Sequence, residues 1–171
     1  MNSQLDKSAE PPVPRLFNSD VETGLRIAFL LDAGDRGLVD LERLVSYDYL
    51  LVHSGDVESG PPSLHPAVPF RGSEWLVKRG RIQNGMDLLI ARELADKVFS
   101  DGIFYRASAL TTRFLHLLKS GYSSALRSRA DWVISTFGKY SDRELANYMT
   151  ERVGRWGAEF DGLSVIQEVE F

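Results

Sequence analysis

Apolar side chains recur every three or four residues near the start of the chain, and this spacing predicts two helices there. The apolar stripe of the first helix consists of Val21, Leu25, Ala28 and Phe29. Asn18 or Ser19 can cap its start, and Gly34 ends it. A second and denser stripe begins at Leu38 and ends near Val52, so we expect several sides of that helix to be covered.

Helical spacing returns after the middle of the chain and is interrupted once by a hairpin signal. Two β-prone stretches flank the turn sequence Ser100-Asp101-Gly102, which predicts an antiparallel hairpin over residues 98–105. Ser108 can cap the helix that follows, and Ser141 with Glu144 fits the capping-box pattern at the start of the last helix. The predicted helices after the second one cover residues 73–77, 82–94, 108–118, 123–137 and 141–156.

This order of elements predicts the fold class. Helices followed by a hairpin and then by more helices is the order of a winged helix-turn-helix. We therefore predict a mainly α fold of the α+β class. It would be a winged helix-turn-helix with a small β-hairpin wing and a C-terminal helical extension.

The chain divides into one predicted domain with a flanking segment on each side. Its 171 residues suit a single domain with a substantial core. Residues 1–15 contain three prolines and form a predicted flexible arm, and residues 161–171 form an acidic tail. Residues 16–160 form the domain, which includes a loop over residues 54–73 that is rich in Gly, Pro and Ser. A loop of that length is either functional or ordered by a partner.

Charge is unevenly distributed, although the net charge is only -4. Residues 1–70 carry 5 basic and 11 acidic side chains, residues 71–130 carry 11 basic and 5 acidic ones, and residues 131–171 carry 4 basic and 8 acidic ones. No acidic residue lies between Gly102 and Ala130. A basic segment of this kind can face phosphates, an acidic protein partner or the acidic flanks of its own chain, or it can simply be solvated.

The residue types do not predict an enzyme, a metal site or a cofactor. The chain has no cysteine, which excludes disulfides, thiolate nucleophiles and cysteine-ligated metals. It contains no nucleophile elbow, P-loop or metal-binding histidine motif. No apolar run approaches the length of about 20 residues that a membrane span needs, and residues 1–15 lack the apolar region of a signal peptide. We therefore expect a non-enzymatic, cytoplasmic protein without a cofactor or a membrane segment.

Basic and amide side chains around the predicted hairpin are the candidates for contact with DNA or with an acidic partner. In a winged helix the helix before the hairpin reads DNA, and basic groups on that helix and on the wing touch phosphates. The same fold also serves for protein interaction, and Asp101 at the predicted wing tip is not a basic residue. The candidates are Lys78, Arg79, Arg81, Gln83, Asn84, Lys97, Arg106 and Arg113.

A second group of residues is predicted to contact protein partners through the long loop and the end of the domain. Arg155 and Trp156 stand between two glycines, and an exposed tryptophan beside an arginine is typical of an interface. The alternative is a tryptophan that folds back onto the core. The candidates are His53, Asp56, Leu64, His65, Phe70, Trp75, Arg155 and Trp156.

Six short stretches between Leu16 and Phe160 are similar to one known protein family. They are residues 17–19, 50–56, 60–66, 71–74, 102–107 and 154–160. The most specific is the loop sequence Gly60-Pro61-Pro62-Ser63-Leu64-His65-Pro66. Together they resemble the middle component of ABC-three-component systems, which are bacterial conflict systems that overlap with Lamassu-type anti-phage defence.

The resemblance implies a small winged-helix subunit without catalytic residues of its own. Such a subunit would bridge an SMC- or ABC-type ATPase, whose coiled-coil arms sense DNA, and an effector that is often a nuclease. Its partners would be the ATPase, the effector and double-stranded DNA held by the ATPase. The residues by themselves leave open a function from another class, a free-standing winged-helix transcription regulator that binds DNA as a homodimer.

Overall fold

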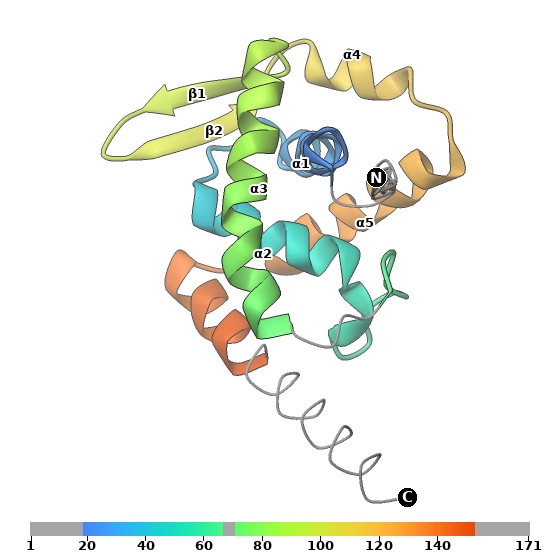
Figure 1. The fold of residues 1–171 in the computed structure, drawn as a ribbon, viewed down its shortest axis with the longest axis vertical. Coiled ribbons are helices and arrows are strands. Elements are labelled where there is room, and N and C mark those ends of the chain that lie inside the picture. Colours follow the sequence, from blue (N-terminus) through green and yellow to red (C-terminus); the bar gives the residue numbers. More distant parts are fainter. Residues whose placement is uncertain (1–18, 67–70, 153–171) are drawn as a thin grey trace, which may run out of the picture.

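A computed structural model describes residues 19–66 and 71–152, the latter with side chains from residue 77 onward. Figure 1 shows α1 at the centre, with α3 crossing it and with the hairpin and α4 pointing away from each other. The elements are α1 (Asp20–Ala33), α2 (Leu41–Val52), the 3₁₀ helix η1 (Ser54–Asp56), α3 (Arg71–Ala91), β1 (Ala95–Phe99), β2 (Ile103–Ala107), α4 (Thr111–His116), α5 (Gly121–Phe137) and a helix over residues 142–152. The predicted arm, residues 1–15, and the predicted tail, residues 161–171, lie outside the described residues.

Local capping signals determine where several helices begin and end. The Ser19 hydroxyl accepts a hydrogen bond from the Glu22 amide at 3.2 Å, and Gly34 ends α1 as predicted. At the last helix the Ser141 hydroxyl accepts from the Glu144 amide at 3.2 Å, and the Glu144 carboxylate accepts from the Ser141 amide at 2.7 Å. These two bonds confirm the predicted capping box.

Helix α3 is continuous where the sequence predicted two helices. The prediction of separate helices over residues 73–77 and 82–94 was wrong, because one helix runs from Arg71 to Ala91. Glycines lower helix propensity in this segment, but Gly85 is needed for packing. A Cβ atom at Gly85 would lie 2.9 Å from the backbone nitrogen of Gly24 in α1, so a glycine lets the two helices approach this closely.

Strands β1 and β2 pair antiparallel around the predicted turn, which confirms the hairpin. Val39, in the connection between α1 and α2, exchanges two backbone hydrogen bonds of 2.9 and 2.8 Å with Tyr105 of β2. These bonds attach the base of the hairpin to the helices. The mainly helical chain with one small antiparallel hairpin is consistent with the predicted winged-helix-like α+β layout.

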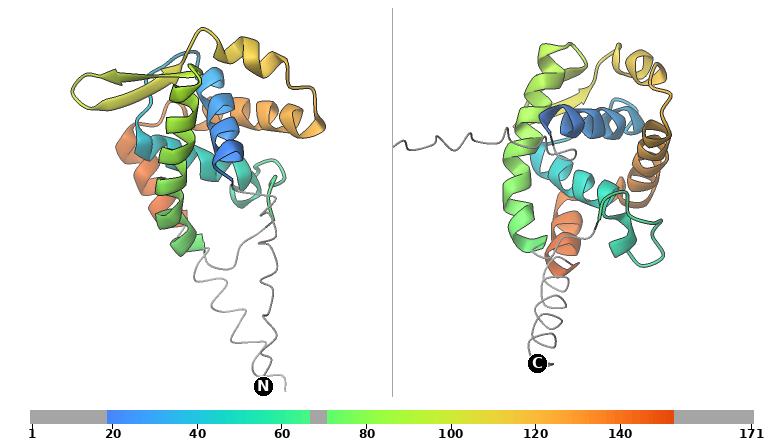
Figure 2. Two further views of the ribbon diagram at one scale, coloured as in Figure 1. Left: turned by 45° about the horizontal axis from the view of Figure 1, so that its top comes forward. Right: turned by 45° about the vertical axis from the view of Figure 1, so that its right-hand side comes forward.

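Helix α1 forms the middle of the core because its neighbours cover it on several sides. It packs against α2, α3, α4, α5 and β2, an arrangement that Figure 2 shows from two directions. Ile27, Ala28, Leu30 and Leu31 are accordingly buried. Polar side chains that α1 directs inward must therefore find partners in the interior. Among the described helices, none has the length and apolar character needed to cross a membrane.

Candidate functional site

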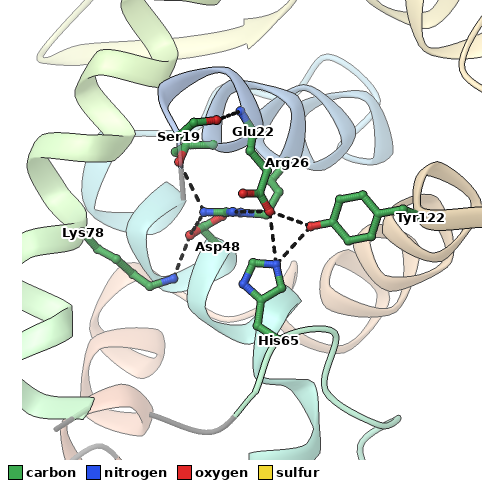
Figure 3. A network of polar contacts seen from close by, with 8 residues as sticks. Ser19, Glu22, Arg26, Asp48, His65, Lys78 and Tyr122 are labelled. Carbon is green, nitrogen blue, oxygen red and sulfur yellow. Dashed lines mark hydrogen bonds and ion pairs between the residues drawn. The ribbon is translucent and has the colours of Figure 1, made fainter. Parts of the chain in front are cut away.

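Six polar side chains meet in the interior between α1 and its neighbours (Figure 3). Arg26, Asp48, His65 and Lys78 are buried. Because a buried charge is costly unless it is paired and hydrogen-bonded, the contacts within this cluster decide what it can do. We call the cluster the polar junction, and its members are Glu22, Arg26, Asp48, His65, Lys78 and Tyr122.

Asp48 of α2 is the acceptor at the centre of the polar junction. Arg26 donates from Nε to Oδ1 at 2.6 Å and from Nη2 to Oδ2 at 3.2 Å. Lys78 Nζ donates to Oδ2 at 2.8 Å. Burial alone would raise the pKa of Asp48, but the charges and hydrogen bonds of Arg26 and Lys78 outweigh burial and hold this pKa well below its usual range. Asp48 therefore stays ionised and links α1, α2 and α3.

Glu22 connects the loop after η1 to α1 and α5. The Tyr122 hydroxyl donates to Glu22 Oε1 at 2.8 Å, and His65 Nε2 lies 3.0 Å from that hydroxyl and 3.2 Å from the same carboxylate oxygen. Burial, followed by the charge of Arg26, lowers the pKa of His65, so its imidazole is mostly neutral at pH 7. Burial, followed by the bond to Glu22, raises the pKa of Tyr122.

The polar junction is suited to holding helices in place rather than to reacting with a substrate. Its two carboxylates, Glu22 and Asp48, face the two basic side chains Arg26 and Lys78, so the formal charges cancel. The exposed fraction of the side chain is 12% at Glu22 and at most 6% at Arg26, Asp48, His65 and Lys78. A general acid or base must reach its substrate within hydrogen-bond distance, which this burial prevents. We assign the polar junction a structural role.

A groove of about 460 Å³ lies between α2 and the helix over residues 142–152. Arg43 holds its two walls together, because the guanidinium pairs with Asp142 at 2.7 Å and donates to the Tyr140 carbonyl at 2.6 Å. Leu145, Ala146 and Met149 line the groove, and its accessible lining is mainly apolar. Within the described residues, no group of three or more His, Asp or Glu side chains could hold a metal ion.

The structure divides the predicted DNA contacts into internal, paired and surface side chains. Lys78 is buried against Asp48, which corrects the prediction that it faces DNA. Ion pairs or hydrogen bonds join Arg79 to Glu42 at 2.6 Å, Gln83 to Asp87 at 3.0 Å and Arg106 to Asp96 at 3.3 Å. Arg81 is half-buried, and Asn84, Lys97 and Arg113 are exposed. Exposed pairs are weak and exchange readily, so DNA contact by Arg79 or Arg106 stays a prediction.

The predicted protein contacts in the loop face the interior of this chain where they are described. His53 and His65 are buried, which corrects the prediction that they face a partner, and Asp56 and Leu64 are half-buried. The amides of Leu64 and His65 both donate to the Val52 carbonyl, at 2.9 and 3.1 Å, and so fold the loop back onto α2. Phe70, Arg155, Trp156 and the side chain of Trp75 lie outside what the structure describes.

The tip of the hairpin carries an exposed apolar pair that the sequence analysis missed. Alternation along β1 puts Ala95, Lys97 and Phe99 on one face, and Ala95 at the base of the hairpin is buried. The hairpin extends beyond the helices (Figure 1), so the same face is open at its end. Phe99 is 73% exposed, and Ile103, its cross-strand partner, is 48% exposed. We call Lys97, Phe99 and Ile103 the wing tip.

Lys97 completes the wing tip, because its Nζ lies 5.5 Å from the centre of the Phe99 ring. The period-two pattern of β1 could have shown that Phe99 shares a face with buried Ala95. It could not show how far the hairpin extends beyond the helices, since that depends on where α1 and α3 end in space.

Comparison with known proteins identifies one similarity. Residues 16–159 match the family model described as ABC-three component (ABC-3C) system Middle Component 2. No curated protein and no solved structure matches the chain. The matched segment includes both the polar junction and the wing tip.

Proposed function

Because the chain belongs to the Middle Component 2 family of ABC-three-component systems, we propose that it is a non-catalytic adaptor subunit of an anti-phage defence complex. In this proposal it bridges an SMC- or ABC-type ATPase and an effector such as a nuclease. The family supports a role in a defence system with other subunits. The exposed apolar side chains on the surface of the chain support the adaptor role.

The observation that carries the proposal is the exposed apolar pair at the wing tip. Phe99 and Ile103 lie opposite each other across the hairpin and are both largely exposed. Aromatic side chains are enriched in the cores of protein interfaces, and a few of them supply much of the binding energy. The two backbone bonds between Val39 and Tyr105 hold the base of the hairpin, so the pair is presented by a preorganised element.

Protein partners explain the described surface better than DNA does. Lys78 is not accessible, and the exposed Arg79 and Arg106 are only weakly paired with Glu42 and Asp96, so they remain available for secondary contacts. Phosphates would attract the remaining basic side chains but would gain little from an exposed Phe99. DNA held by the ATPase stays an additional contact within the proposal, through the exposed side chains of Asn84, Lys97 and Arg113.

The proposal is tested by co-expressing the full chain with the ATPase and the effector encoded beside it. We expect the subunits to purify together and to elute as one complex, and we expect the chain alone to hydrolyse neither ATP nor DNA. The double variant Phe99→Ser/Ile103→Ser should lose at least one subunit while keeping its thermal midpoint. Val21→Ser is the matched control, because Val21 is 69% exposed on α1 and distant in sequence from the hairpin.

Two outcomes would contradict the proposal. A chain that associates with neither subunit is not an adaptor, and a wing-tip variant that binds both subunits like the wild type does not use the wing tip. Salt-sensitive binding of one DNA sequence by a homodimer, in preference to random duplex, would favour the transcription-regulator alternative.

A further inference from the structure

A second exposed apolar surface lies on the segment around α4, away from the wing tip (Figure 1). Leu110 is 43% exposed and Leu117 is 77% exposed. Both residues flank α4 directly and have right-handed helical backbone angles, with φ and ψ of -88° and -21° at Leu110 and -76° and -19° at Leu117. The helical geometry therefore extends over residues 110–117.

Helical spacing puts the exposed residues of this segment on one face. Positions 110, 113 and 117 follow the i, i+3, i+7 pattern, so Arg113 lies between the two leucines. The opposite face consists of Thr111 and Leu115, which are both fully buried. The leucines thus belong to an outward face and not to the core. We call Leu110, Arg113 and Leu117 the leucine–arginine stripe.

The basic side chains Arg113 and Lys119 lie on and beside the stripe, while Asp32 of α1, which contacts this segment, is engaged by Thr112 and Arg127. His116 and Lys119 are exposed next to Leu117, and no acidic residue occurs anywhere between Gly102 and Ala130. Among the described residues, Arg113 and Lys119 have no carboxylate within ion-pair distance, in contrast to the paired Arg106. The surface therefore combines two exposed leucines with two cations, Arg113 and Lys119, that no carboxylate of the described residues pairs.

We propose that the leucine–arginine stripe is a docking surface for an acidic segment of a partner protein. Apolar side chains of that segment contact Leu110 and Leu117, and its carboxylates pair with Arg113 and Lys119. Attraction between the opposite charges speeds the association, and burial of the two leucines stabilises the complex. A nucleic acid would use the charge but would leave both leucines against sugar and phosphate. The inference rests on the proposed function only in that a bridging subunit needs two separate faces.

A titration of the isotope-labelled full chain tests the surface without requiring the natural partner. The probe is a synthetic amphipathic helix of Glu and Leu, and the charge control is the same helix with Lys in place of Glu. We expect saturable NMR shifts confined to residues 110–119 with the acidic peptide, and weaker binding at higher salt. Leu117→Glu should weaken the binding by about tenfold or more, whereas Val21→Glu, at a similarly exposed position of α1, should not change it.

The co-expressed complex gives the second readout. Leu117→Glu should release one subunit, and the wing-tip variant should release the other. If neither subunit binds the wild type, the proposed function is refuted. The peptide titration still tests the docking surface independently in that case. The docking surface is overturned by the absence of saturable shifts over residues 110–119, or by equal effects of Leu117→Glu and Val21→Glu. It is also overturned by self-association that Leu117→Glu abolishes, or by duplex DNA binding that needs Arg113 but tolerates Leu117→Ala.

Discussion

Replacing Asp48 with alanine removes the carboxylate that two buried cations share. Arg26 and Lys78 donate three hydrogen bonds to it, and their side chains are only 2% and 5% exposed. Removing one partner of a buried ion pair costs about 3–5 kcal/mol, because the remaining charge is left in the interior. Arg26 keeps Glu22 at 3.2 Å as a counter-charge, but Lys78 loses its partner. We expect Asp48→Ala to lower the free energy of unfolding by about 3–5 kcal/mol.

This loss is measurable by urea denaturation and by thermal melting, both followed by circular dichroism. For a chain of this size, 1 kcal/mol corresponds to a change of about 2–4 °C in Tm. The expected decrease in Tm is therefore about 6–20 °C. Combining Asp48→Ala with Lys78→Met should recover part of the loss, because the second change removes the uncompensated ammonium, and a coupling of about 1 kcal/mol or more is expected.

Asp96→Ala is the matched control, because Asp96 also pairs with an arginine, Arg106, but both side chains are 48% exposed. Exposed pairs contribute about 1 kcal/mol or less, so this variant should unfold close to the wild type. Equal losses in Asp48→Ala and Asp96→Ala would refute the reasoning, since burial of the cations would then be irrelevant.

Acid denaturation gives an independent check on Asp48. Its pKa is depressed in the folded state, so its contribution is present above the unfolded pKa of about 3.9 and is lost as the pH falls through the folded value. Below about pH 4 the free energy of unfolding of Asp48→Ala should therefore decrease less than that of the wild type. A variant with the full acid dependence of the wild type would show that the carboxylate is not held ionised by Arg26 and Lys78.

Two further predictions concern α3 and the loop. Gly85→Ala should lower the free energy of unfolding by about 1–3 kcal/mol, because the new Cβ would lie 2.9 Å from the Gly24 nitrogen. Gly80→Ala is the control, because a Cβ there has nothing within 4 Å, and it should leave the stability unchanged or raise it. Equal urea midpoints for the two variants would contradict the close contact between the helices. The lowered pKa of His65 means that, at pH values between its folded pKa and the ordinary histidine pKa of 6.5, the unfolded chain binds a proton that the folded chain does not. Wild-type stability should therefore fall as the pH drops through about 6.5, and His65→Gln should lack this component in urea midpoints measured on both sides of that pH.

The sequence by itself determined the local elements of this protein. Ser19, the Ser141 and Glu144 capping box and the Ser-Asp-Gly turn act on backbone groups a few residues away, so their partners can be identified without a fold. The order of helices and hairpin follows from the same short-range patterns, whereas the resemblance to an ABC-three-component subunit rests on six separate stretches of sequence.

Only the tertiary structure decided which charged and apolar side chains are accessible. Lys78 and Asp48 are 30 residues apart, and Arg26 and Asp48 are 22 apart, so nothing local distinguishes the buried Lys78 from its exposed neighbour Arg79. The close approach of Gly85 to Gly24 depends on how α3 packs on α1, and the exposure of Phe99 depends on how far the hairpin extends beyond the helices. Burial is a property of the packed chain, and it separated the charges that hold the helices together from those available to a partner.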